Sequence, residues 1–125
     1  MSDKQILENI CNEMASGQWD KHWQNGSYLI RPSGNPLTLE QNNQMRNNKD
    51  IVIEKEEMKK INSIEVYGNF ATACFTVHQT FNYKGQENDD ISVVLAVFKK
   101  EDNSWKMITG SRSQGRSPNE PLPIF

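Results

Sequence analysis

The sequence predicts an α+β fold in which a helical first part is followed by a stranded second part. Apolar residues recur at helical spacing near the start, whereas from Ile51 onward they alternate and turn signals appear at regular intervals. The length of 125 residues fits one domain. We therefore expect a single domain over residues 1–125, with a proline-rich tail at 117–125.

Two helices are expected before residue 24. Ser2 followed by Gln5 is a capping-box pattern, and apolar residues then recur at helical spacing until Gly17. Trp19 and Trp23 lie four residues apart, so a second short helix places both indoles on one face.

A loop and a third helix follow. The apolar run at 28–30 is closed by a rigid loop at 31–36, which is rich in proline and glycine. Thr38 with Gln41 repeats the capping-box pattern. This pattern predicts a helix through about Asn47.

The second part reads as an antiparallel meander. The segment at 51–61 is ambiguous, because its start is β-branched while 54–60 favours helix, and its position before clear strands favours strand. Gly68-Asn69 is a hairpin signal. The remaining strands are predicted at 63–67, 70–83, 91–98 and 105–113.

Both faces of this sheet carry apolar residues. In the strand at 70–83, one parity holds Ala71, Ala73, Phe75, Val77, Gln79 and Phe81, and the other holds Thr72, Cys74, Thr76, His78 and Thr80. Neither set of alternating residues is polar enough to face solvent. The strand at 91–98 also carries apolar residues on both faces. Because three short helices cover only one face, we expect the other to pack against a second copy in a homodimer.

Composition excludes several functions. The net charge of −2 argues against binding to nucleic acid or acidic lipid. No run approaches the roughly 18 apolar residues of a membrane span, and the charged start is unlike a signal peptide, so we expect a soluble cytoplasmic protein. Cys11 and Cys74 are expected as free core thiols, with a disulfide between them as the less favoured alternative. With His22 and His78 as the only histidines, structural zinc is nearly excluded, and no metal or cofactor is expected.

The order of elements and the terminal strand, Trp105-Lys106-Met107-Ile108 closing on Ser111-Arg112-Ser113, resemble the nuclear transport factor 2-like superfamily. The resemblance is to the branch of SnoaL-like proteins and the association (hub) domain of calcium/calmodulin-dependent kinase II. It implies a cone-shaped, cystatin-like roll, in which three N-terminal helices pack on a curved antiparallel sheet.

The same resemblance implies roles for single residues. Hub domains aim several arginines into the cone; Arg112 resembles the one on the terminal strand, His78 falls near a second and Leu95 near a third. Two departures stand out, since Ser111 replaces a histidine and Gln114 is an insertion within the motif.

The candidate site combines aromatic and polar residues. His78 is the candidate catalytic base or ligand contact, or else a hydrogen-bonded structural histidine. Arg112 either binds an anionic ligand or forms a structural ion pair. The aromatic residues form a pocket wall or simply part of the core. The candidate ligand-binding residues are Trp19, Trp23, Tyr28, His78, Arg112, Ser111 and Ser113.

These residues predict a small-molecule-binding protein with a polar-lined cavity for a small polar or anionic ligand. An isomerase or cyclase, or a hub-like oligomerisation module, is the alternative. Ketosteroid-isomerase chemistry requires an inward carboxylate, and the acids of the central strands lie in or beside a loop, at Glu87, Asp89 and Asp90. The charges at 54–60 are predicted to form a solvated face. Iota-class carbonic anhydrase activity is not expected, because 109–113 lacks histidine.

Overall fold

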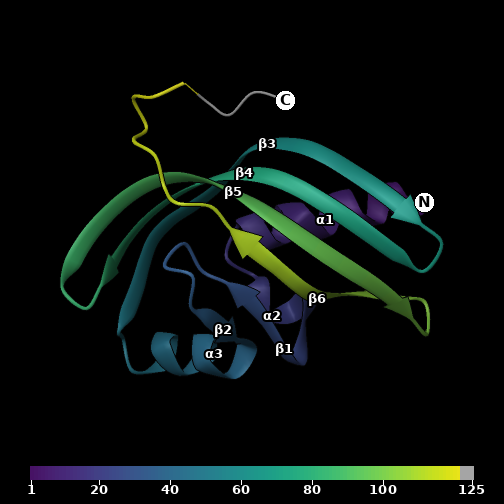
Figure 1. Ribbon diagram of the computed structural model, residues 1–125, viewed down its shortest axis with the longest axis horizontal. Coiled ribbons are helices and arrows are strands. Elements are labelled where there is room, and N and C mark those ends of the chain that lie inside the picture. Colours follow the sequence, from purple (N-terminus) through teal and green to yellow (C-terminus); the bar gives the residue numbers. More distant parts are fainter. Residues whose placement is uncertain (122–125) are drawn as a thin grey trace.

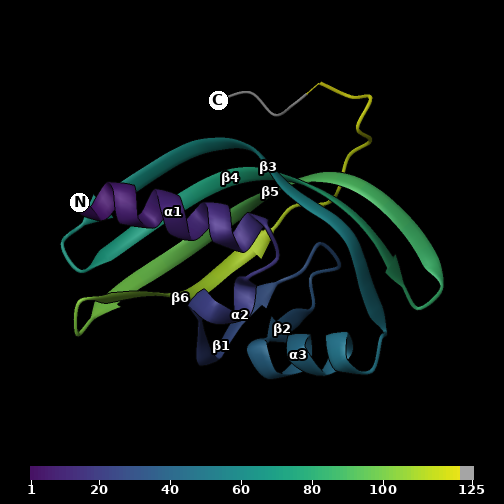
Figure 2. The same ribbon diagram turned by 180° about the vertical axis from the view of Figure 1, so that it is seen from behind.

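The computed structural model describes residues 1–121, and residues 122–125 of the predicted tail lie outside the described part. Figure 1 shows a curved sheet that arches over two of the helices, and Figure 2 shows the first helix on the same side of the sheet. The predicted α+β class is confirmed. The elements run α1 (Asp3–Ala15), α2 (Trp19–His22), β1 (Trp23–Ile30), β2 (Pro36–Thr38), α3 (Leu39–Asn47), β3 (Ile51–Tyr67), β4 (Phe70–Tyr83), β5 (Gln86–Glu101) and β6 (Ser104–Arg112).

Helices α1 and α3 begin where their capping patterns predict. The Ser2 hydroxyl accepts a 3.2 Å hydrogen bond from the Gln5 backbone N–H. At α3, Thr38 and Gln41 form a complete capping box, with bonds of 3.1 and 2.9 Å. Each cap satisfies backbone N–H groups that the first turn of a helix leaves without a partner.

The second helix is shorter than predicted. It is a single turn that ends at His22, and Trp23 already has extended backbone angles and begins β1. Strands β1 and β2 therefore separate α2 from α3. All three predicted helices are present, with α2 reduced to four residues. The prediction that all three helices precede the strands is wrong, because β1 and β2 come before α3.

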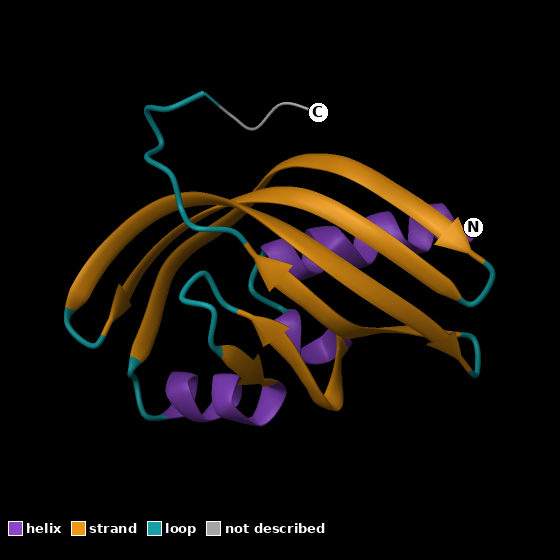
Figure 3. Ribbon diagram, in the orientation of Figure 1, coloured by secondary structure: helices purple, strands orange, loops and turns teal. Residues whose placement is uncertain are grey.

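The sheet has six strands in the order β2-β1-β6-β5-β4-β3, drawn in orange in Figure 3. Strands β3 to β6 form the predicted antiparallel meander. Strand β1 pairs with β6 in parallel, with Leu29 opposite Gly110, so the prediction of a purely antiparallel sheet is wrong at this pair. A parallel pair needs a long connection, and here it contains most of the chain.

The predicted hairpin at Gly68-Asn69 is present. Tyr67 pairs with Phe70, and Gly68 has a φ of 64°, a left-handed value that glycine adopts without strain. The turn between β5 and β6 places Asp102 and Asn103 at positive φ as well. Aspartate and asparagine are among the residues that tolerate this conformation.

Strand β3 is interrupted by bulges. Its register against β4 shifts between Ile53 and Lys55, and again at two later points, between residues 58 and 60 and between 61 and 63. Each bulge inserts one residue, so side chains no longer alternate simply between the two faces. Ile53 and Glu56 consequently point to the same face, although they lie three residues apart. The prediction of a solvated face at 54–60 is wrong for Glu56, whose side chain is only 3% exposed.

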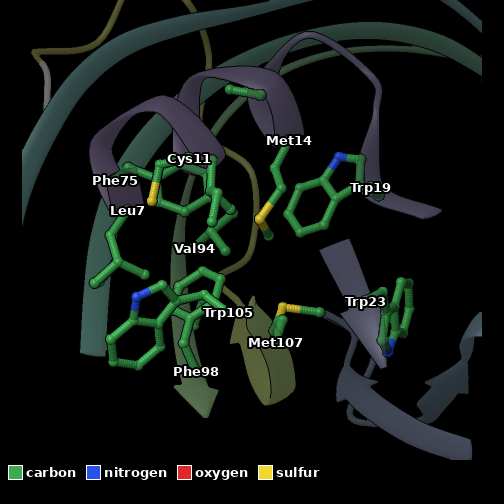
Figure 4. Packing of buried hydrophobic residues seen from close by; sticks show 14 of the residues in the cluster. Leu7, Cys11, Met14, Trp19, Trp23, Phe75, Val94, Phe98, Trp105 and Met107 are labelled. Atoms are coloured by element: carbon green, nitrogen blue, oxygen red, sulfur yellow. The ribbon is translucent and has the colours of Figure 1, made fainter. Parts of the chain in front are cut away.

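A single apolar cluster joins α1 to the concave face of the sheet. Figure 4 shows Leu7, Cys11 and Met14 of α1 directed toward residues of the sheet. The ring of Trp19 lies 6.3 Å from that of Phe75, centroid to centroid. The buried sheet residues of the cluster include Phe75, Val94, Phe98, Trp105 and Met107.

The convex face of the sheet is less covered. All three helices of residues 1–121 lie on the concave side (Figures 1 and 2). On the convex face Leu95 is 45% exposed, and it lies between the partly buried Val93 and Val97 on β5. Cys74 on β4 pairs with Leu95. This face carries the second apolar surface that the strand pattern predicts.

Candidate functional site

A cavity of about 470 Å³ lies between the concave face of the sheet and the segment from α2 to α3. Its volume is in the range typical of small-molecule sites. The walls are aromatic and aliphatic on one side, from Trp19, Trp23, Ile51, Ile53, Phe81 and Tyr83. The polar part of the lining includes Arg31, Arg46, Arg112, Asn42, Asn88 and Gln79.

Arg112 is held firmly in this wall. Its Nε donates a 2.8 Å hydrogen bond to the Ser92 hydroxyl, and its Cζ lies 5.6 Å from the centroid of the Phe81 ring. Burial lowers the pKa of the Arg112 guanidinium, while the charges of Glu56 and Asp90 oppose this shift. Within residues 1–121 the Nε bond is the only hydrogen bond of this guanidinium. Its terminal nitrogens remain available to an anion.

A second polar group lies behind the same wall. The Gln79 side-chain amide donates a 2.6 Å hydrogen bond to Oε1 of Glu56, and Nη2 of Arg46 lies 3.6 Å from the same oxygen. Burial raises the pKa of Glu56, although Arg46, the Gln79 hydrogen bond and Arg112 each lower it. The Glu56 carboxyl therefore has a pKa above the ordinary glutamate value. It lies close to three cavity-lining side chains, those of Gln79, Arg46 and Arg112.

The two tryptophans reach the cavity from consecutive elements. Trp19 belongs to α2 and Trp23 to the start of β1, and both side chains are buried. The indole Nε1 of Trp23 is buried and has no hydrogen-bond partner within residues 1–121. Trp23 thus contributes an apolar surface together with an unused hydrogen-bond donor.

The structure brings together three of the predicted site residues, Trp19, Trp23 and Arg112. Tyr28, His78 and Ser111 alternate with cavity-facing neighbours along their strands and point to the opposite face of the sheet. Ser113 follows the end of β6 and does not line the cavity, and its hydroxyl accepts a 2.9 Å hydrogen bond from the Val93 N–H. Leu95, the third position suggested by the hub resemblance, also lies on that convex face.

His78 has charged neighbours on the convex face. Its Nε2 lies 2.6 Å from Oδ1 of Asp89, and its Nδ1 lies 3.4 Å from Oε1 of Glu57. Asp89 belongs to the start of β5, so the acids at 87–90 lie in a strand, directly beside the turn at 84–85. Because the sheet separates this imidazole from the cavity, His78 cannot act as base on a molecule bound there.

Sequence reasoning missed Glu56, Gln79 and Arg46. A signal existed for Gln79, because it stands on the parity of β4 that otherwise holds Ala71, Ala73, Phe75, Val77 and Phe81. No periodicity reveals Glu56, since the bulge at Glu54 changes its side. Arg46 lies on a helix with no buried residue, and only its contact with β3 shows its position.

Three further features of the described residues concern metal ions, cysteines and membranes. Within residues 1–121 no group of three or more His, Cys, Asp and Glu side chains is placed to hold a metal ion. Cys11 and Cys74 are both free thiols, but only Cys11 belongs to the core, so the prediction of a core thiol is wrong for the partly buried Cys74. None of the helices in this part of the chain is both long and apolar enough to cross a membrane.

Comparison with known proteins places the fold in a family. The family model described as "Protein of unknown function (DUF3804)" matches residues 2–120. No curated protein matches the chain. The crystal structure of an NTF2-like protein of unknown function from Prochlorococcus sp. NATL2A is 36% identical, with coverage of 94% of this chain and 96% of that one and a TM-score of 0.82.

Two more distant structures share the fold alone. A candidate calcium/calmodulin-dependent kinase II association domain from Exiguobacterium sibiricum is 13% identical, with coverage of 95% of this chain and 98% of that one and a TM-score of 0.75. A candidate ketosteroid isomerase from Parabacteroides distasonis is 15% identical, with coverage of 95% and 92% and a TM-score of 0.66. The chain therefore belongs to the DUF3804 family, within the nuclear transport factor 2-like superfamily.

Proposed function

We propose that the cavity binds a small molecule that carries an anionic group and an apolar body. Three arginines, Arg31, Arg46 and Arg112, line the cavity, and no acidic side chain does so among the described residues. The aromatic wall suits the apolar body of the same molecule. Such a protein is a binding protein, and catalysis is not required by this arrangement.

The guanidinium of Arg112 is the observation that carries this proposal. Ser92 and Phe81 fix its orientation, so little conformational entropy remains to be lost when an anion binds. A carboxylate accepts bonds from two guanidinium nitrogens at once, which gives both affinity and orientation.

The test compares carboxylates with their uncharged amides. We expect phenylacetate, but not phenylacetamide, to raise the melting temperature of the protein. Arg112→Gln should abolish this effect. Arg116→Gln is the matched control, because Arg116 follows β6 outside the cavity lining and its side chain bonds to the Pro121 carbonyl. Equal stabilisation of the Arg112 variant and the unaltered protein, or no effect of any carboxylate, would contradict the proposal.

A specific observation favours a second role, which is self-association. The convex face around Leu95 has no cover within the described residues, and one structure with this fold is described as a candidate association domain. We propose that two copies pack through this face, as closed dimers are the commonest oligomers. A hub-like ring is the alternative arrangement.

Light scattering after size-exclusion chromatography tests this second role. The unaltered chain should elute with the mass of a dimer, and Leu95→Lys should shift it to a monomer. Val66→Lys is the control, because Val66 is 37% exposed and pairs with Ala71 on the other face. A monomeric unaltered chain would refute the proposal, and a ring of many copies would favour the hub-like alternative.

A further inference from the structure

One hydrogen-bond acceptor in the cavity wall is unused. Gln79 lines the cavity and is only 5% exposed. Its Nε2 donates to Glu56, but its Oε1 is buried and has no partner within residues 1–121. Native proteins rarely leave a buried carbonyl without a donor, because that group has lost its hydrogen bonds to water. Gln79 therefore indicates that another molecule supplies the donor.

The orientation of the Gln79 amide follows from its neighbour. An ionised carboxylate only accepts hydrogen bonds, so the NH2 group of Gln79 must face Glu56 and the carbonyl oxygen must face elsewhere. Arg46 lies beside the same carboxylate oxygen and favours the ionised form. Oε2 of Glu56 is also buried without a partner among the described residues. The Gln79 carbonyl is thus an acceptor of fixed orientation, while Glu56 lies behind the wall and does not line the cavity.

We infer that Gln79 determines specificity, by accepting a hydrogen bond from a neutral donor, a hydroxyl or an N–H, on the bound molecule. The inference rests on the proposed function, and it extends the ligand class to anions that also carry such a donor. A neutral donor suits the wall better than an ammonium group, because three arginines line the cavity.

The expected discrimination is about tenfold in dissociation constant, because only a ligand that carries the donor satisfies the otherwise unpaired carbonyl. The apolar wall alone cannot produce this difference. A methoxy group is larger and less polar than a hydroxyl. Its contacts with Trp19, Phe81 or Tyr83 would therefore stabilise the complex at least as much as those of a hydroxyl. Hydroxyl and methoxy compounds therefore separate the two explanations.

Isothermal titration calorimetry with matched probes provides the test. The probes are phenylacetate, the 2-, 3- and 4-hydroxyphenylacetates, and the three corresponding methoxy compounds. We expect at least one hydroxy isomer to bind about tenfold more tightly than its methoxy partner and phenylacetate. Gln79→Met should remove this preference while carboxylate binding persists. Gln44→Met is the matched control, because Gln44 is an exposed amide on α3 that does not line the cavity.

A second variant keeps the inference testable if Gln79→Met does not fold. In Glu56→Gln the neighbouring side chain both donates and accepts, so the Gln79 amide can turn and present either end to the cavity. The hydroxyl preference should then shrink. An undiminished preference in the variant that folds would overturn the role of Gln79.

The remaining outcomes separate this inference from the proposed function. If every isomer pair binds equally to the unaltered protein and Arg112→Gln abolishes binding, anion binding stands and the role of Gln79 is refuted. If none of the probes binds, the proposed function is refuted and the inference fails with it.

Discussion

Glu56 and Gln79 face each other across strands β3 and β4, joined by a 2.6 Å hydrogen bond from the Gln79 amide to the Glu56 carboxylate. The next residue, Glu57, pairs with His78 on the opposite face of the sheet. Two consecutive glutamates therefore have opposite surroundings. Burial raises the pKa of Glu56, whereas hydrogen bonds from Lys59 and His78 lower the pKa of Glu57 to about 2.

The two glutamates should titrate on opposite sides of the ordinary glutamate value of 4.5. Carboxyl carbon-13 NMR of the folded protein measures both midpoints in one pH series. We expect the Glu57 signal to change near pH 2 and the Glu56 signal above pH 4.5. Glu56→Gln and Glu57→Gln assign the two signals. Coincident midpoints near 4.5 would show that the sheet does not separate their environments.

Glu57 should make the folded state sensitive to acid. Its pKa is lower folded than unfolded, so its stabilisation is present above about pH 4.5 and is lost as pH falls toward 2. The free energy of unfolding in urea should therefore fall over this range, and the fall should be smaller in Glu57→Gln. Exposed Glu65 provides the control variant, Glu65→Gln, which should follow the unaltered protein. An identical acid response in all three proteins would contradict the prediction.

Phe75 should be among the most sensitive core positions. Its side chain is completely buried beside Trp19, so Phe75→Ala leaves a cavity and should cost about 3 to 5 kcal/mol in the free energy of unfolding. Phe70→Ala is the control, because Phe70 is 47% exposed at the hairpin. Urea denaturation monitored by tryptophan fluorescence compares the two. Similar losses at both positions would mean that α1 does not seal this cluster.

The two cysteines should differ in reactivity. Burial, with a smaller contribution from Glu8, raises the pKa of the Cys11 thiol to about 12, so at pH 8 almost no reactive thiolate is present. Cys74 is only partly buried on the convex face. Ellman's reagent should modify Cys74 first and reach Cys11 only at the rate of unfolding. The variants Cys11→Ser and Cys74→Ser isolate each rate, and rapid modification of Cys11 in the native protein would contradict its burial.

Local signals in the sequence predicted local structure well. The Thr38 to Gln41 capping box and the Gly68 turn depend on groups within a few residues of each other, and both form as expected. The parallel pairing of β1 with β6 depends on the whole intervening chain, so the apolar run at 28–30 gave no indication of its partner.

The lining of the candidate site can be predicted from the sequence only in part. Trp19, Trp23 and Arg112 line the candidate cavity, and large aromatic side chains and an arginine on a strand stand out in the sequence without knowledge of their neighbours. His78 was placed on the wrong face, because alternation identifies two faces without showing which one the helices cover. Glu56 was missed because a bulge reverses the alternation within an otherwise charged segment.

The bulges of β3 also affect how the length of this strand can vary. Deleting Glu54 would remove the extra residue and leave Ile53 opposite Phe81 and Glu56 opposite Gln79. Strand β4 has no bulge against β5, because its register with β5 is continuous from Phe70 to Tyr83. A deletion in β4 would therefore shift this register. Related chains should therefore gain or lose single residues at positions such as 54, on the outer strand of the sheet, while the polar pair beside the cavity stays in place.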